Sequence, residues 1–515
     1  GFYRGQLAAD GAVTPASVKA AMQRWLTRPV LAVRVEPGER EAYAEAADNR
    51  PAPAPAAPLT IPPRAPIPPV GEMRPLVFPA TERLRLSNGM EVVYARSTTV
   101  PITRVAVEFN AGLAADPADE LGAQTLMLGL LKEAAGDRDA AQIAEREEQL
   151  GASISAGASM DRTVISLMSP TANLDPALAL MGDIIRRPAF RPGDIERRRT
   201  QQLAQIAQER SSPNGMAGRA WPALVFGADH PYGRPMTGLG SPESVGAISR
   251  EDLQAFHARW IRPDLAQIFV VSDKPLSEVA ALLEAHLGQW APPASARGEK
   301  NFAAAVPTAQ PRIILIDRPQ SPQSIILGAM VLPTTGHQDR VVFTAANEAI
   351  GSGFLSRINQ DIRETRGWSY GLGGSAAGLE QQVPYIISAP VQSNRTGESV
   401  QVLIDQYRAF LSDRGVTAAE RERIVNANVR QIPGQFETSA ALLGALRSNA
   451  LYGRPDDYWT TLAPRYQGLD QAALDAEARR LLGEAPFVWV VVGDAATVRP
   501  QLEALGLPVE VRTAQ

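Results

Sequence analysis

The sequence predicts an α+β protein of two homologous repeats, each a mostly antiparallel sheet packed with helices. Two observations lead to this fold class. Apolar strands and amphipathic helices follow one another in mixed order, which is typical of α+β layers and not of a doubly wound parallel sheet. A helix–strand pattern also recurs along the chain, which indicates an internal duplication.

Composition limits the classes of function. The chain has 515 residues, of which 45% are hydrophobic and 21% charged, as expected of a globular protein with several domains. A net charge of −4 gives no reason to expect nucleic acid as a partner. The absence of cysteine excludes disulfides, thiolate metal sites and thiol nucleophiles. No window holds the roughly 18 uninterrupted apolar residues of a membrane span.

A proline-rich segment divides the chain. Pro51–Pro69 reads PAPAPAAPLTIPPRAPIPP, which favours neither helix nor ladder because proline lacks the backbone N–H. We therefore expect an extended, semi-rigid linker over 41–71.

The elements after the linker follow from local patterns. Two alternating apolar runs in Leu84–Ala95 flank Asn88-Gly89, which predicts a hairpin. Further strands are expected at Ile102–Phe109 and Thr163–Met168. The periodicity predicts four helices in this region: 118–135, 139–150, 176–187 and 192–209.

The internal repeat consists of an N-cap residue, an amphipathic helix and a strongly apolar strand. It is seen in Ile248–Asp273 and, without gaps, in Leu469–Asp494. The aligned pairs are a cap, a helix leucine and an apolar anchor: Ser249 and Asp470, Leu253 and Leu474, Trp260 and Leu481.

A third copy precedes the linker. In Val13–Pro37 the residues Thr14, Val18 and Trp25 take the equivalent places. We expect Gly1–Arg40 to be the tail of a preceding homologous domain in a longer polypeptide, followed by two complete repeats over 72–297 and 298–515. No signal peptide pattern is seen at the start of the sequence.

Several phrases, in order, carry a family resemblance. They are LSNGMEVVYAR (86–96), HPYGRPMTG (230–238), ISREDLQAFHARWIRPD (248–264) and GSGFLSRINQDIRETRGWSYG (351–371). With these phrases the chain resembles the insulinase-like, pitrilysin-type zinc peptidases, the inverzincins. The resemblance implies a half-clamshell fold, because active members close two such halves around a peptide.

Active members carry an H-x-x-E-H zinc motif on the helix after the second strand. The resemblance aligns that motif with Thr125–Gly129, T-L-M-L-G, so that Thr125, Leu128 and Gly129 stand in the places of the two histidines and the glutamate. The third ligand would fall near Leu203–Ile206, where Ala204 and Gln205 stand and Glu209 is out of register. We therefore expect no metal and no catalytic residue in this chain alone.

The histidines offer no replacement for these ligands. They are far apart in sequence, and each is interpreted as a surface or capping residue: His230, His257, His286 and His337.

Arg363 and Tyr370 are the candidate substrate-binding residues. The resemblance implies that the C-terminal part of active members supplies an arginine and a tyrosine in this spacing to the substrate and the scissile carbonyl. An arginine fork can grip a carboxylate or carbonyl, and a tyrosine hydroxyl can donate to a developing oxyanion. The alternative is a surface ion pair and a tyrosine that fills a strand position.

The resemblance implies the non-catalytic half of a peptide-degrading, periplasmic zinc metallopeptidase. Zinc is expected in a homologous partner half, upstream on the same polypeptide or in a separate subunit, with a peptide as substrate. Nucleic acid and a membrane span are not expected. A purely structural or assembly protein is the alternative, and metal analysis would test a third possibility, an autonomous zinc peptidase.

Overall fold

The computed structural model describes residues 1–36, 71, 75–308 and 310–513. The chain divides into two compact units, Gly1–Gly71 and Glu72–Gln515, which are described separately. The linker predicted over Pro51–Pro69 lies outside the described residues.

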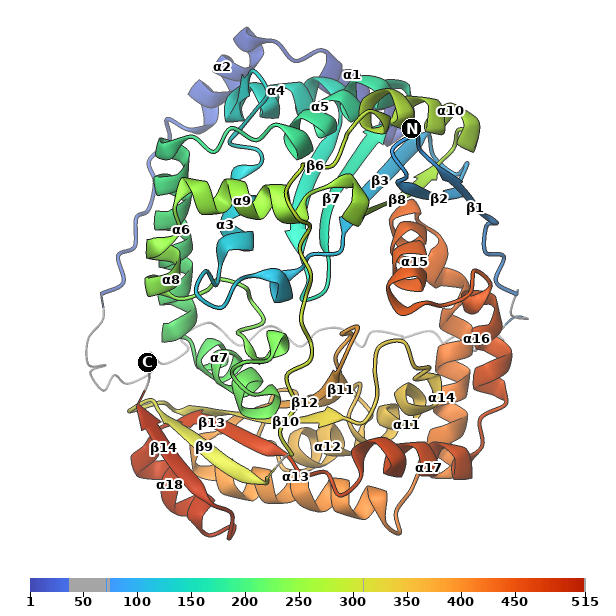
Figure 1. Ribbon diagram of the computed structural model, residues 1–515. Coiled ribbons are helices and arrows are strands. Elements are labelled where there is room, and N and C mark those ends of the chain that lie inside the picture. The colour runs from blue at the N-terminus through green and yellow to red at the C-terminus, as the bar shows by residue number, and fades with distance from the viewer. Residues whose placement is uncertain (37–70, 72–74, 309, 514–515) are drawn as a thin grey trace, which may run out of the picture. The chain divides into compact units, whose positions relative to one another are not determined.

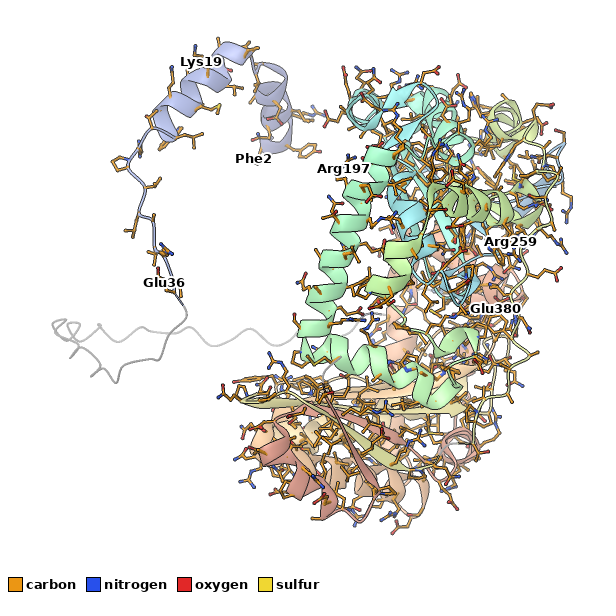
Figure 2. The ribbon with its side chains drawn as sticks, turned by 60° about the vertical axis from the view of Figure 1, so that its left-hand side comes forward. Phe2, Lys19, Glu36, Arg197, Arg259 and Glu380 are labelled. Carbon is orange, nitrogen blue, oxygen red and sulfur yellow. The ribbon has the colours of Figure 1, made fainter. Side chains whose placement is uncertain are left out.

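The described part of the first unit contains two helices, α1 (Phe2–Gly11) and α2 (Pro15–Trp25), and Figure 2 marks Phe2, Lys19 and Glu36 along it. The predicted cap of α2 is present, because Thr14 and Ser17 form a reciprocal capping box. The predicted strand after α2 is not formed among the described residues up to Glu36. A strand needs a neighbour to pair with, and the described part of this unit offers none.

The second unit contains two six-stranded sheets (Figure 1). The first sheet has the order β1-β2-β8-β3-β7-β6, in which only β2 and β8 pair in parallel. Its strands are β1 (Thr81–Arg85), β2 (Glu91–Arg96), β3 (Ile102–Phe109), β6 (Ser153–Ala158), β7 (Thr163–Pro170) and β8 (Ala266–Ser272). A separate short pair joins β4 (Ala134–Ala135) and β5 (Arg138–Asp139). The predicted hairpin is confirmed, and Gly89 supplies the left-handed turn with φ +89°.

The second sheet has the order β11-β12-β10-β13-β9-β14, with β9 parallel to both β13 and β14. Its strands are β9 (Arg312–Asp317), β10 (Gln323–Leu332), β11 (Gly373–Ala376), β12 (Val383–Gln392), β13 (Val488–Gly493) and β14 (Val509–Thr513). Five of its strands correspond to the first sheet, since β11, β12, β10, β13 and β9 take the places of β6, β7, β3, β8 and β2. The edge strands differ, because β14 pairs in parallel with β9 and β1 pairs antiparallel with β2. The predicted fold class, two α+β repeats with mostly antiparallel sheets, is confirmed.

The repeated helix–strand pattern maps onto equivalent places in the two sheets. In the first repeat α9 (Arg250–Trp260) leads into β8, and in the second α17 (Gln471–Leu482) leads into β13. Ser249 and Asp470 cap these helices by accepting a backbone N–H. The aligned apolar residues are all buried: Leu253, Leu474, Trp260 and Leu481.

The remaining helices cover the sheets. Those of the first repeat are α3 (Ala123–Leu130), α4 (Ala140–Leu150), α5 (Leu174–Arg186), α6 (Pro192–Ser211), α7 (Pro213–Phe226), α8 (Pro242–Ala247) and α10 (Leu276–Leu283). Those of the second are α11 (Val341–Ile350), α12 (Arg357–Asn359), α13 (Thr396–Leu411), α14 (Ala418–Gln431), α15 (Ser439–Tyr452), α16 (Tyr458–Gln467) and α18 (Ala495–Glu503). Short 3₁₀ or π segments are η1 (Leu113–Ala115), η2 (Thr171–Asn173), η3 (Pro231–Gly233), η4 (Pro263–Leu265), η5 (Glu284–Gly288), η6 (Gln360–Thr365), η7 (Ser393–Arg395) and η8 (Pro433–Phe436).

The two repeats exchange one helix each. Helix α7 of the first repeat packs on β10 and β13 of the second sheet, and its Trp221 lies in a buried cluster with Val490. Helix α15 of the second repeat packs on β2, β3 and β8 of the first sheet, where Leu446 joins Val93 (Figure 1). Each sheet therefore buries one face against its own helices and part of the other against its neighbour's helix.

The helix predicted over 118–135 is shorter than expected. Asp116 accepts the backbone N–H groups of Gly122 and Gln124 at 2.8 and 3.0 Å, and α3 begins only at Ala123. Gly122 adopts φ +95°, which ends the preceding turn. Strand β6 was not predicted, because SISAGA carries little apolar alternation. No helix among the described residues is long and apolar enough to cross a membrane.

Candidate functional site

The helix that would carry the zinc motif is α3, and its three predicted motif positions hold no metal ligand. The Thr125 hydroxyl donates to the Gly238 carbonyl at 2.6 Å. Leu128 packs against the core of the first repeat. Gly129 has no side chain, and a Cβ there would lie 3.8 Å from Arg198. Hydroxyl, aliphatic and glycine positions supply neither the imidazoles nor the carboxylate that zinc requires.

Helix α6 closes against α3 through polar contacts. Gln202 is buried and donates to the carbonyls of Gly122 and Leu239 at 3.1 and 2.8 Å. Glu133, just after α3, accepts from Arg198 at 2.5 Å and also pairs with Arg197, which Figure 2 labels on α6. Gln202 and Glu133 are therefore already engaged by groups of the fold.

The positions expected for a third ligand on α6 hold no carboxylate. Ala204 and Gln205 are exposed, whereas the buried positions are Gln202 and Ile206. Glu209 is engaged elsewhere and pairs with an arginine of α7 at 2.7 Å. The residues present do not fit a zinc ion, and within the described ranges no three His, Asp or Glu side chains gather as a metal-binding group.

Asp116 anchors the start of α3. Its carboxylate is buried and accepts two backbone N–H groups. Burial raises the pKa of Asp116 to about 7, because desolvation outweighs those hydrogen bonds and the nearby Arg234.

The histidines have separate local partners. His230 caps η3 by accepting the Tyr232 N–H at 3.0 Å, but it is buried, and burial lowers its pKa. The predicted capping role of His230 is thus confirmed, whereas a surface position is wrong. The other contacts are His257 to the Ile185 carbonyl at 2.8 Å, His286 to Asp175 at 2.7 Å and His337 to Glu380 at 3.6 Å.

Arg363 and Tyr370 both belong to the segment between α12 and β11. Arg363 lies in η6, with its guanidinium 4.7 Å from the centre of the Phe354 ring and 3.1 Å from Glu364. Tyr370 lies in the following loop with 89% of its surface exposed, so it fills no strand position. Their role in binding substrate stays a prediction.

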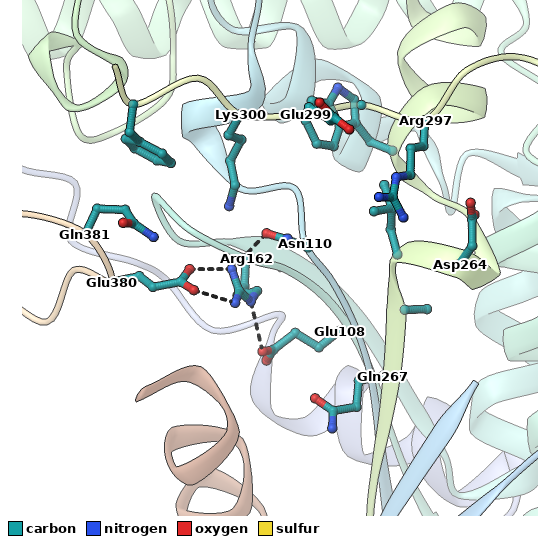
Figure 3. A pocket seen from close by; sticks show the side chains of 15 residues that line it. Glu108, Asn110, Arg162, Asp264, Gln267, Arg297, Glu299, Lys300, Glu380 and Gln381 are labelled. Carbon is teal, nitrogen blue, oxygen red and sulfur yellow. Dashed lines mark hydrogen bonds and ion pairs between the residues drawn. The ribbon is translucent and has the colours of Figure 1, made fainter. Parts of the chain in front are cut away.

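An ionic network joins the two repeats, and the sequence did not reveal it (Figure 3). Arg162, in the turn between β6 and β7, binds Glu380 with two parallel hydrogen bonds of 2.6 and 3.0 Å. It also donates to Asn110 at 2.9 Å. Glu108 of β3 lies 3.8 Å from Arg162 and accepts from Arg447 of α15 at 2.7 Å. Arg162 and Glu108 are largely buried, so each charge depends on its partners.

A polar cavity of about 570 Å³ adjoins this network. Lys300 lines it and points toward the Arg162–Glu380 pair in Figure 3, donating to the Asp161 carbonyl at 2.6 Å. Burial lowers the pKa of Lys300 to about 8.

The HPYG segment (230–233) contacts both hairpins of this network through Tyr232. The Tyr232 hydroxyl donates to Asp161 and accepts the backbone N–H of Gln381. Glu380 donates its N–H to the other Asp161 oxygen at 3.0 Å. Arg162 lies in the β6–β7 hairpin and Glu380 in the β11–β12 hairpin. These hairpins take equivalent places in the two repeats, so an alignment of the repeats could have identified them as a pair. The side-chain contact between them carries no local sequence signal.

Comparisons with known proteins agree with this fold and these segments. The model described as "Insulinase (Peptidase family M16)" matches residues 91–227, and that described as "Peptidase M16 inactive domain" matches residues 247–428. The chain belongs to peptidase family M16, the insulinase family.

Individual relatives extend the match over both repeats. An uncharacterised zinc protease of Mycobacterium leprae is 27% identical over 381 residues, covering 72% of this chain and 83% of the relative. A crystal structure of a peptidase M16 inactive domain from Pseudomonas fluorescens matches with a TM-score of 0.74 and 23% identity, covering 81% of this chain and 98% of that one.

The periplasmic protease PqqL of Escherichia coli is a larger structural neighbour. It matches with a TM-score of 0.66 and 15% identity, covering 95% of this chain but only 52% of PqqL. At these identities the two solved structures show the fold alone.

Proposed function

We propose that this chain is the non-catalytic half of a peptide-degrading zinc metallopeptidase. It forms part of the wall of a peptide chamber and supplies contacts to a zinc-bearing homologous half. One contrast carries the proposal. Thr125, Leu128 and Gly129 offer no ligands where the family's motif lies, whereas the second repeat keeps a half-buried Arg363 and an exposed Tyr370.

Arg363 and Tyr370 each have a role that their chemistry allows. The Arg363 guanidinium can hold a peptide carbonyl or carboxylate through parallel hydrogen bonds, and stacking on Phe354 limits its freedom. The Tyr370 hydroxyl can donate to the oxyanion that develops when the peptide carbonyl is attacked. The chemistry at the metal belongs to the other half.

The match to PqqL supports a proposal for the partner and for the cellular location. Because this chain corresponds to about half of PqqL, we infer a second homologous half, on the same polypeptide or as a separate subunit. The capped helix α2, whose sequence aligns with α9 and α17, supports a preceding homologous domain, followed by a linker over 41–71 and repeats over 72–297 and 298–515. The periplasmic location printed for PqqL supports the same location here.

Reconstitution with a zinc-bearing homologous half tests the proposal. Hydrolysis of a quenched fluorescent peptide is measured with wild-type chain, Arg363→Ala, Tyr370→Phe and the control Arg408→Ala, an exposed arginine of α13. Loss of a transition-state donor lowers kcat by about 100-fold for Tyr370→Phe. Loss of a charged hydrogen bond lowers kcat/KM by about 10-fold or more for Arg363→Ala. The control keeps wild-type activity.

The alternative function, a purely structural or assembly protein, predicts a different outcome. In that case both Arg363→Ala and Tyr370→Phe leave hydrolysis unchanged, and no homologous zinc-bearing half copurifies with the chain. Unchanged hydrolysis in both variants would remove the assigned roles.

A further inference from the structure

A second cavity, of about 690 Å³, lies in the second repeat between α11, α14, α16 and the loop after α11. Six of its lining residues carry the argument: Arg340, Asn347, Glu348, Arg423, Arg454 and Trp459. By strand and helix order, α11 and α14 correspond to α3 and α6 of the first repeat. The first pair is closed by side-chain contacts such as Gln202, whereas the second pair borders this cavity.

The charges around the cavity favour an anion. Three arginines line it against one carboxylate, that of Glu348. Glu348 accepts from Asn428 at 2.8 Å, and burial raises its pKa against the opposing effect of Arg423. Arg454 lies 4.3 Å over the Tyr458 ring, so its charge is held beside the cavity.

Two residues that line the cavity each carry a buried donor atom without a hydrogen-bond partner among the described residues. These atoms are Nη2 of Arg423, on α14, and Nε1 of Trp459, on α16. A buried donor without an acceptor costs free energy, and a charged donor costs more than a neutral one. A ligand that brings acceptor oxygens would remove both costs.

The wall of the cavity is preorganised. Asn347 accepts from the Tyr385 hydroxyl at 2.6 Å and donates to the Gly374 carbonyl at 2.8 Å, so its amide is fixed between α11 and β11. Phe354, whose ring lies under the Arg363 guanidinium, also lines the cavity. A ligand in the cavity therefore lies next to the residue proposed to contact the peptide.

We propose that this cavity binds a carboxylate of a peptide, with Arg423 and Trp459 as the hydrogen-bond donors. The aromatic rings that line the cavity would pack against the apolar peptide residue next to that carboxylate. A carboxylate accepts through both oxygens and so can serve donors from two helices. The choice of a peptide as carrier rests on the proposed function, whereas the choice of a carboxylate rests on the charges and donors of the cavity.

Calorimetric titration of the whole chain with short acetylated peptides tests the inference. The probes are Ala-Ala-Ala-Phe with a free C-terminal carboxylate, the same peptide as its amide, and the amide of Ala-Glu-Ala-Phe. The free acid is expected to bind about 10-fold tighter than its amide or better. If the glutamate amide binds as tightly as the free acid, the site is supported and takes an acidic side chain as well as a terminus.

Variants place the binding in this cavity. Arg423→Gln weakens binding of the free acid about 10-fold or more, and Trp459→Phe, which keeps an aromatic ring but removes the donor, weakens it several-fold. Arg430→Gln, an exposed arginine on the same helix, is the matched control and leaves affinity unchanged. Thermal unfolding of Arg423→Gln and its control shows whether the fold is kept.

Equal affinity for the free acid and both amides would overturn the inference, as would wild-type affinity in both Arg423→Gln and Trp459→Phe. The titration needs neither zinc nor a partner half. Its failure would therefore be distinguishable from a failure of the proposed function, which is judged by hydrolysis in the reconstituted protein.

Discussion

Arg162 and Glu380 join the two repeats through the tips of equivalent hairpins, with Nη1–Oε2 and Nη2–Oε1 distances of 2.6 and 3.0 Å. Their side chains are only 17% and 13% exposed, and Glu108 lies on the other side of the arginine. We expect Arg162→Met to lower the free energy of unfolding by about 3 kcal/mol, because it leaves the Glu380 carboxylate buried without its partner. Urea denaturation measures the change.

A second bidentate pair between the repeats is the matched control. Arg83 binds Asp456 at 2.6 and 2.7 Å, but both side chains are more than 40% exposed. Solvent screening limits the cost of Arg83→Met to about 1 kcal/mol or less. Equal losses in the two variants would contradict the view that burial makes the Arg162 pair important.

The exchanged helices are expected to make the two repeats unfold together. Trp221 of α7 is buried against the second sheet, and Leu446 of α15 against the first. Trp221→Ala costs about 3–5 kcal/mol and Leu446→Ala about 2–5 kcal/mol. In scanning calorimetry each variant shifts one common transition downward, whereas Ala223→Ser on the exposed side of α7 leaves it in place. Two separate transitions, only one of which moves, would argue against this coupling.

Asp116 is expected to make stability depend on pH. Its pKa in the folded protein is about 7, above the usual value of 3.8, so the folded state holds the proton more tightly than the unfolded state. The stability contributed by this proton is complete below about pH 4 and is lost as the pH rises through about 7. Wild-type Tm should therefore fall relative to that of Asp116→Asn between about pH 5 and pH 8.

The measurement is a series of thermal unfolding curves for both proteins, with Asp119→Asn, an exposed carboxylate on the same loop, as control. A Tm difference between wild type and Asp116→Asn that stays constant across this pH range would show that Asp116 does not titrate there.

Local sequence patterns predicted the elements that depend on local chemistry. The turn at Asn88-Gly89 and the caps at Ser249 and Asp470 were predicted correctly, since turn residues and capping side chains act within a few positions of themselves. The start of α3 was predicted too early, because the carboxylate of Asp116 draws the N–H groups of Gly122 and Gln124 into a turn.

Features that depend on tertiary contacts could not be predicted from local sequence patterns. Helices α7 and α15 each cover an apolar face of the other repeat's sheet. The sequence of an amphipathic helix does not specify which sheet the helix will cover. On α6 the buried Gln202 bonds the carbonyl groups of Gly122 and Leu239, which are far away in sequence and give no local signal. The unpartnered donors of Arg423 and Trp459 are visible only when three helices are in place.

The zinc content of the purified chain tests the central claim most directly. After incubation with excess zinc and desalting, plasma mass spectrometry measures the metal that remains bound. Thr125, Leu128 and Gly129 supply no ligands, and the facing side chain of α6, Gln202, is bound to backbone carbonyls. The account therefore predicts no stoichiometric zinc, whereas one tightly held zinc ion per chain would contradict it.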